Sequence, residues 1–112
     1  MSDLPLRPVE FQILVILAER PAHGYAIIRE TERRTGGKVR LQPGTLYRAI
    51  QRLEDAELIR ETDAPAEDAS TDPRRRYFGL TEAGHEVAGE DAGRLAALVE
   101  EARAAGLFAE PS

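Results

Sequence analysis

Apolar residues recur at intervals of three and four along much of the chain, which is the spacing of amphipathic helices. In the first half this pattern predicts three helices, over residues 8–20, 24–35 and 43–56. Gly36 and Gly37 end the second helix, because glycine readily adopts the left-handed conformation that closes a helix.

Shorter runs in which polar and apolar residues alternate predict strands over residues 38–41, 58–62 and 76–80. Residues 63–73 separate the last two strands; this stretch is acidic, contains proline and has almost no large apolar side chain. Such a stretch cannot bury a core, so we expect a mobile loop there.

A fourth helix is predicted from Thr81, a good N-cap residue, to about Ala105, and Gly106 ends it. Its length, about 36 Å at 1.5 Å per residue, exceeds what so small a domain can cover. Spacings of four and three residues, as in a coiled-coil seam, relate Gly84, Ala88, Asp91, Leu95, Leu98, Ala102 and Ala105. This helix either packs on its own domain or pairs with a second copy, and the residues expected to pair are Leu95, Leu98, Val99 and Ala102.

The order of these elements contains the parts of a winged helix-turn-helix, in which the third helix enters the major groove and a hairpin reaches along the DNA backbone. The sequence therefore predicts a mainly α fold with a small β-hairpin wing and a long C-terminal dimerisation helix. We expect a DNA-binding domain over residues 1–80 and the dimerisation helix and tail over residues 81–112.

The net charge of −5 is unusual for a DNA-binding protein, but the charges are unevenly distributed. Residues 1–60 carry 10 Lys and Arg against 8 Asp and Glu, whereas residues 61–112 carry 5 against 12. Attraction to phosphate depends on local patches within a Debye length of about 8 Å, not on net charge. The first half of the chain and the cluster Arg74–Arg76 are therefore the candidate basic surfaces.

Other classes of function find little support in the composition. The 112-residue chain has no cysteine, and no ligand pattern joins its two histidines, His23 and His85, so we expect no metal and no cofactor. There is no nucleophile beside a base, no phosphate-cradling loop and no cluster of acids, so we expect no enzyme. No apolar stretch approaches the roughly 20 residues of a membrane span, and we expect a cytoplasmic protein.

The segment PGTLYRAIQRLE carries the residue types that DNA recognition needs. Gly44 allows a phosphate to approach the backbone at a helix start, and Thr45 and Tyr47 offer hydroxyl groups. Donors able to read base edges follow at Arg48, Gln51 and Arg52. The alternative is an amphipathic surface helix whose polar face is only solvated.

Further candidate contacts lie outside this helix, at Tyr25, Lys38, Arg74, Arg75 and Arg76. The helical pattern turns Tyr25 inward with Ile27, so this residue is either a core tyrosine with a buried ring or a phosphate contact through its hydroxyl. His23 is interpreted as structural. The three arginines either grip phosphate or the minor groove from the wing, or they pair with the acidic loop before them.

The motifs FQILVILAE, HGYAI, TGG, PGTLYRAIQRLE, the LI that follows and RRRYFGLTEAG together resemble the PadR-type transcriptional regulators, over residues 5–105. The resemblance implies DNA contacts from Thr45 and Tyr47, a second helix that starts against the DNA backbone, and a homodimer formed by the last helix. We expect a repressor that binds an inverted-repeat operator and is released by a small-molecule effector. The alternative is a winged-helix module that binds protein and not DNA.

This chain departs from the family pattern at three points. Glu57 stands where the family usually has glycine, so a left-handed turn there would be strained by about 1 kcal/mol, unless the helix simply continues through it. The wing loop is long and acidic. The chain has no tryptophan, so the stacking of planar drugs between tryptophans, known in some members, is not implied.

Overall fold

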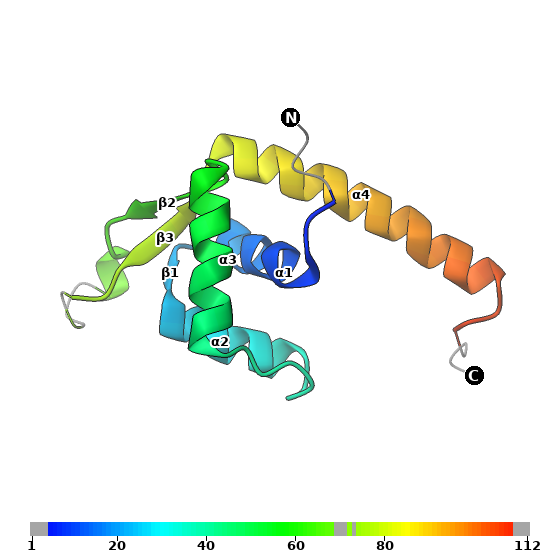
Figure 1. Cartoon of the computed structure of the whole chain (residues 1–112), viewed down its shortest axis with the longest axis horizontal. Coiled ribbons are helices and arrows are strands. Elements are labelled where there is room, and N and C mark those ends of the chain that lie inside the picture. Colours follow the sequence, from blue (N-terminus) through cyan, green and yellow to red (C-terminus); the bar gives the residue numbers. More distant parts are fainter. Residues whose placement is uncertain (1–4, 69–71, 73, 109–112) are drawn as a thin grey trace.

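The structure is a computed structural model that describes residues 5–68, 72 and 74–108. Along the chain the elements are α1 (Pro8–Glu19), β1 (Ala22–His23), α2 (Gly24–Arg34), α3 (Pro43–Asp55), β2 (Ile59–Thr62), the 3-10 turn η1 (Ala66–Asp68), β3 (Tyr77–Leu80) and α4 (Glu82–Ala104). Figure 1 shows α1, α2 and α3 grouped beside a small sheet, with α4 running across the top and away from them. The four predicted helices and the wing hairpin are confirmed, with ends that differ by one or two residues.

The sheet is antiparallel, with strand order β1-β3-β2. In the wing hairpin Ile59 pairs with Leu80 and Thr62 with Tyr77, while Ala22 of β1 pairs with Phe78 on the other side of β3. The segment that joins the two wing strands contains η1, a turn that the sequence did not predict.

The strand predicted over residues 38–41 was wrong, because that segment wraps around the end of α2. The Lys38 amide donates to the Thr35 carbonyl at 3.1 Å, and the Val39 amide donates to the Thr35 hydroxyl at 3.0 Å. Within the segment only Leu41 is buried. The third strand of the sheet is β1, whose two residues are too few to show a periodic pattern.

The core lies where the first three helices meet the sheet. Its completely buried side chains include Ile13 of α1, Ile27 of α2, Leu46 of α3 and Phe78 of β3. Helix α3 contributes one apolar stripe, formed by Leu46, Ala49, Ile50 and Leu53. Because this stripe faces the core, the opposite face of α3 is turned to solvent.

Helix α3 ends in a left-handed residue, as the sequence predicted for Glu57, whose φ is 60°. The Leu58 amide donates to the Leu53 carbonyl at 2.9 Å, and the Glu57 amide donates to the Glu54 carbonyl at 2.9 Å. These are the two bonds of a Schellman motif. The alternative, in which the helix continues through Glu57, was wrong. Helix α2 closes in the same way with Gly36, at a φ of 62°.

Helix α4 divides into a packed half and an exposed half. Gly84 lies against the Leu58 carbonyl and Asp91 is completely buried, so the first part of the predicted coiled-coil seam packs on its own domain. The second half projects from the domain (Figure 1) and leaves Leu98 and Val99 51% and 41% exposed. Among the described residues, no helix combines the length and the apolar character that crossing a bilayer requires.

Candidate nucleic-acid interface

The outward face of α3 carries most of the predicted recognition residues. Gly44, Tyr47, Arg48 and Gln51 are exposed and Thr45 is half-buried, since all five lie off the apolar stripe. Some of these side chains bond to neighbours on the same helix. Arg48 Nη2 lies 3.4 Å from the Thr45 hydroxyl, and Gln51 Nε2 donates to Asp55 Oδ1 at 3.0 Å. These contacts are on the surface, so a ligand can replace them at little cost.

Tyr25 is 56% exposed, so both its predicted inward orientation and its interpretation as a core tyrosine were wrong. Tyr25 precedes Ile27 by two residues, which at 100° per residue places it on the opposite side of α2. The guanidinium of Arg29 lies 5.7 Å from the centre of the Tyr25 ring. Sequence reasoning missed Arg29, although its spacing of four residues from Tyr25 was a usable signal.

The start of α2 and the face of α3 meet at Gly24 and Tyr47. A Cβ at Gly24 would lie 2.5 Å from the Tyr47 hydroxyl, so the absence of a side chain at Gly24 is what allows the Tyr47 ring to lie there. Tyr47 itself is 49% exposed. The two exposed tyrosines, Tyr25 and Tyr47, thereby flank the same hollow of the surface.

Arg52 has a different position from the other α3 donors. Its Nε donates to Glu10 Oε2 of α1 at 2.8 Å, and Glu10 is buried. The carboxylate of Glu10 also accepts the Arg7 amide at 2.9 Å. Arg52 adjoins Leu53 of the apolar stripe, so its side chain leaves α3 near the edge of the core. Of the six predicted α3 residues, it is the one for which the structure shows an ion pair.

The wing arginines have three different environments. Arg74 Nε pairs with Asp72 Oδ1 at 3.2 Å, as the alternative of pairing with the acidic loop predicted. Arg76 pairs with Glu61 at 3.1 Å and with Glu54 at 3.5 Å. Arg75 Nη1 lies instead 3.1 Å from His23 Nε2. The three neighbours in sequence are therefore not equivalent.

His23 closes the start of α2, in line with its structural interpretation. Its Nδ1 accepts the Ala26 amide at 3.1 Å, which is the bond of a helix N-cap. The ring meets Tyr77 edge-on, with centroids 5.2 Å apart, and is parallel to Tyr25. Burial and the nearby Arg75 lower the pKa of His23, while Asp68 raises it; the net direction is downward. This shift favours the neutral form of the ring.

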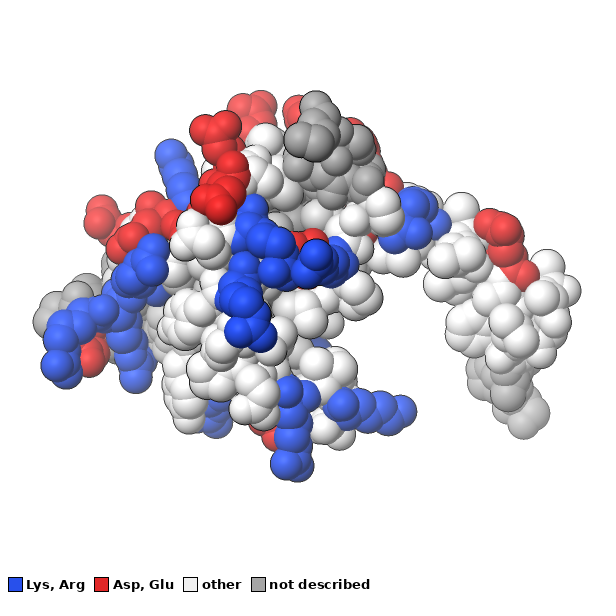
Figure 2. All heavy atoms as spheres, in the orientation of Figure 1, with Lys and Arg blue, Asp and Glu red and all other residues white. Residues whose placement is uncertain are grey.

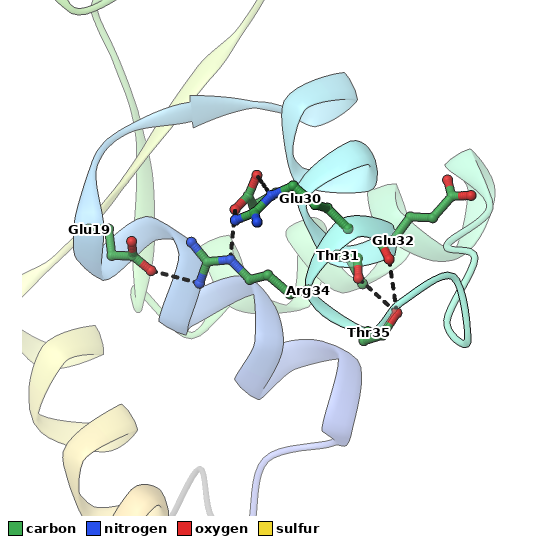
Figure 3. Close-up of polar contacts among 7 residues, drawn as sticks. Glu19, Glu30, Thr31, Glu32, Arg34 and Thr35 are labelled. Carbon is green, nitrogen blue, oxygen red and sulfur yellow. Dashed lines mark hydrogen bonds and ion pairs between the residues drawn. The ribbon is translucent and has the colours of Figure 1, made fainter.

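Polar contacts also fix α2 against α1 (Figure 3). Arg34 donates from Nη1 to Glu19 at 2.6 Å and from Nε to Glu30 at 2.8 Å. Hydrogen bonds from Arg33 and then Arg34 lower the pKa of Glu30 to about 2. Glu30 therefore favours its ionised form near neutral pH and helps to hold Arg34, the last residue of α2, where it reaches Glu19 at the end of α1.

A pocket of about 270 Å³ opens between the start of α2, Tyr47 and the wing. Arg74, Arg75 and Arg76 line it together with one acid, Asp72. Two further acids of the loop, Glu67 and Asp68, pair with Arg20 at the end of α1. The balance of charge around the pocket favours an anion.

Several basic residues lie on one visible face of the molecule. Figure 2 shows Lys and Arg side chains over α3, the wing and α2, and acidic side chains above the end of α3 and the start of α4, with others beside the wing and on the projecting part of α4. Lys38 is exposed in the segment between α2 and α3. No group of three or more His, Cys, Asp and Glu residues suited to a metal ion occurs in the described ranges. The arrangement can bind a polyanion along α3 and the wing.

Comparisons with known proteins agree with this geometry. The family model described as the transcriptional regulator PadR-like family matches residues 13–90. An uncharacterized 37.1 kDa protein in transposon TN4556 of Streptomyces fradiae is 41% identical over 95 residues, which cover 83% of this chain and 25% of that protein. This chain therefore spans about a quarter of that relative.

Solved structures with the same fold include regulators from two clostridia. A transcriptional regulator from Clostridium thermocellum superposes with a TM-score of 0.73 at 24% identity, covering 98% of both chains. A PadR family transcription regulator from Clostridium difficile R20291 gives a TM-score of 0.70 at 24% identity, covering 85% of this chain and 94% of that one. At this level of identity the likeness concerns the fold.

Proposed function

The chain belongs to the PadR-like family of transcriptional regulators, and from this premise we propose that it binds operator DNA as a homodimer and represses transcription. The observation that carries the proposal is the exposed face of α3, which continues into the arginine-lined pocket at the start of α2. In this arrangement Thr45, Tyr47, Arg48 and Gln51 reach base edges or phosphates from the major groove. Lys38, Arg74 and Arg75 approach the DNA backbone on either side.

The homodimer is proposed from the exposed half of α4. A helix that leaves Leu98 and Val99 in solvent has an apolar surface without a partner in its own domain. Pairing of two α4 helices, through these residues with Leu95 and Ala102, would relate two domains by a twofold axis. Their α3 helices would then fit half-sites one helical turn, about 34 Å, apart, which corresponds to an inverted repeat.

We further propose that the bound protein represses transcription and that a small-molecule effector releases it from the DNA. A regulator of this kind acts in the cytoplasm, has no catalytic step and changes expression by occupying its operator. A reporter gene placed behind the bound sequence tests this directly: the protein lowers expression, and an effector restores it. Increased expression would make the protein an activator.

Selection of bound duplexes from a random DNA pool tests the DNA-binding function itself. The expected result is an enriched inverted repeat whose mobility shift weakens steeply with salt, because each neutralised phosphate releases counterions. If the pool yields no enrichment and the protein shifts no duplex at low salt, the alternative of a protein-binding module replaces this proposal.

A further inference from the structure

We propose that His23 and Arg75 together bind one phosphate of the DNA backbone, and that His23 takes part as an uncharged hydrogen-bond donor. The inference rests on the proposed function and assigns to His23 a binding role in addition to its role in capping α2. It follows from the geometry of the two ring nitrogens.

The helix cap determines which nitrogen of His23 carries the proton. Nδ1 accepts the Ala26 amide at 3.1 Å, so Nδ1 has its lone pair directed at that amide and carries no hydrogen. In a neutral imidazole the hydrogen is then on Nε2. The second ring nitrogen is therefore a donor, and the fold fixes this tautomer by a backbone bond.

The group that meets Nε2 is also a donor. Arg75 Nη1 lies 3.1 Å from it, and a guanidinium has no acceptor atom. The contact brings two N–H groups side by side, and no hydrogen bond from either of them to an acceptor is found among the residues that the structure describes. A negatively charged oxygen within reach of both groups would accept from both and turn an unfavourable contact into two charge-assisted bonds.

The surroundings suit an anionic oxygen. The pocket of about 270 Å³ is lined by both His23 and Arg75, and the hydroxyl-bearing side chains of Tyr25 and Tyr47 flank it. The charged and titratable groups that face His23 are Arg75 before β3, Asp68 of η1, Tyr77 of β3 and Tyr25 of α2. Asp68 is itself paired with Arg20. A phosphodiester has two unbridged oxygens and a single charge, which fits one neutral and one cationic donor.

The two donors predict different dependences on salt. A cation that contacts phosphate releases counterions, so its loss reduces the slope of log affinity against log salt by about 0.9 per contact. A neutral donor contributes affinity without changing this slope. His23→Asn separates the roles of the side chain, because asparagine caps a helix as well as any residue but lacks a donor at the position of Nε2.

The experiment compares His23→Asn, Arg75→Gln and the matched control His85→Asn, in mobility shifts of the enriched duplex over a salt series. We expect His23→Asn to weaken binding about tenfold at every salt concentration with an unchanged slope, as for one hydrogen bond to a charged group. Arg75→Gln should weaken binding and flatten the slope, and His85→Asn should behave like wild type. Thermal unfolding of each variant confirms an intact fold.

If His23→Asn binds the duplex with unchanged affinity, His23 only caps α2 and the inference is wrong, while the proposed function stands. If the slope of log affinity against log salt is smaller for this variant than for wild type, His23 does not act as an uncharged donor. Long-range ¹H–¹⁵N spectra give a second readout: the Nε2–H tautomer is expected, and the Nδ1–H tautomer would contradict it.

Titration with inorganic phosphate at constant ionic strength distinguishes free phosphate from DNA. Weak shifts of the His23 nitrogens at millimolar phosphate, with much stronger shifts on adding duplex, are expected. Saturation by phosphate with no response to duplex would make this a site for the free anion and would overturn the DNA contact. If the wild-type protein shifts no duplex, the proposed function fails, and absence of any response to phosphate would then remove the site as well.

Discussion

Arg52 on α3 and Glu10 on α1 form a hydrogen-bonded ion pair that joins the two helices, with Nε of Arg52 2.8 Å from Oε2 of Glu10. Glu10 is 8% exposed, and the same carboxylate accepts the Arg7 amide at the start of α1. One buried side chain thus accepts a backbone amide at the start of the first helix and links that helix to the recognition helix.

Replacing Glu10 with glutamine tests the importance of this pair. Glu10→Gln keeps an acceptor for the Arg7 amide but removes the charge that faces Arg52, so we expect a loss of about 1–3 kcal/mol in the free energy of unfolding. Urea unfolding measures it. Glu19→Gln is the control, because the side chain of Glu19 is 59% exposed, against 11% for Glu10, and pairs with exposed carboxylates contribute about 0–1 kcal/mol. Equal losses in the two variants would contradict a special role for Glu10.

The pair also shows where sequence reasoning reaches its limit. The first three helices were predictable because each has apolar residues at helical spacing and a start or stop signal in the sequence, as the proline at the start of α3 and its stripe of Leu46, Ile50 and Leu53 show. The partner of Arg52 lies 42 residues away in sequence, and no local pattern indicates such a contact.

Other features of the structure were not predicted from the sequence for related reasons. Strand β1 has only two residues and owes its conformation to pairing with β3, so its periodicity could not be seen. The contact of His23 with Arg75 arises when the wing folds back on α2. The face of α3 was predictable because a periodic core stripe defines its opposite side. The pocket beside it depends on contacts between distant segments.

Gly84 is predicted to tolerate no side chain. Its Cβ would lie 2.0 Å from the Leu58 carbonyl oxygen, which already accepts the Thr81 amide at 3.1 Å and cannot easily move. Gly84→Ala should therefore destabilise the protein by at least about 2 kcal/mol. Gly89→Ala is the matched control on the same helix, where nothing lies within 4 Å of the added atom, and it should stabilise by about 0.5–1 kcal/mol. Thermal unfolding of the two variants with shifts in the same direction would refute this prediction.

Leu98→Asp is predicted to break the proposed dimer. Leu98 is half-exposed on the projecting part of α4, and a charge there would face its own copy across a twofold seam. Sedimentation at micromolar concentration should show a monomer, whereas the control Ala97→Asp, which lies off the seam on the same helix, should remain a dimer. If both variants remain dimeric, the main interface lies elsewhere.

The cap of α2 predicts a dependence of stability on pH. The pKa of His23 is lowered in the native state from its ordinary value near 6.5, first by burial and then by Arg75, so between the native and ordinary values the unfolded chain binds more protons. The contribution of His23 to the free energy of unfolding is fully present above pH 6.5 and is lost as the pH falls through the native pKa. His23→Asn keeps the cap without titrating, so its urea midpoint should fall less than that of wild type between pH 8 and about pH 5.5. A parallel fall in both proteins would exclude His23 as the titrating group, and His85→Asn should follow wild type.

Glu57→Gly is predicted to stabilise the fold and leave operator specificity unchanged. Glu57 is the non-glycine residue with positive φ among those described, at 60°, and both Schellman bonds of α3 depend on that conformation. A side chain there costs about 1–2 kcal/mol, because its Cβ approaches the following carbonyl oxygen. Glycine removes this strain but gives the unfolded chain more freedom, which offsets about 0.4–1 kcal/mol. The relief of strain therefore narrowly exceeds the entropic cost, and we expect glycine to be favoured. The hydrogen bond from the Thr81 hydroxyl to the carbonyl of residue 57, at 2.7 Å, involves the backbone and is present in both variants. Urea unfolding should give a higher midpoint for the glycine variant; an equal or lower midpoint would mean that the left-handed conformation of Glu57 carries no appreciable strain.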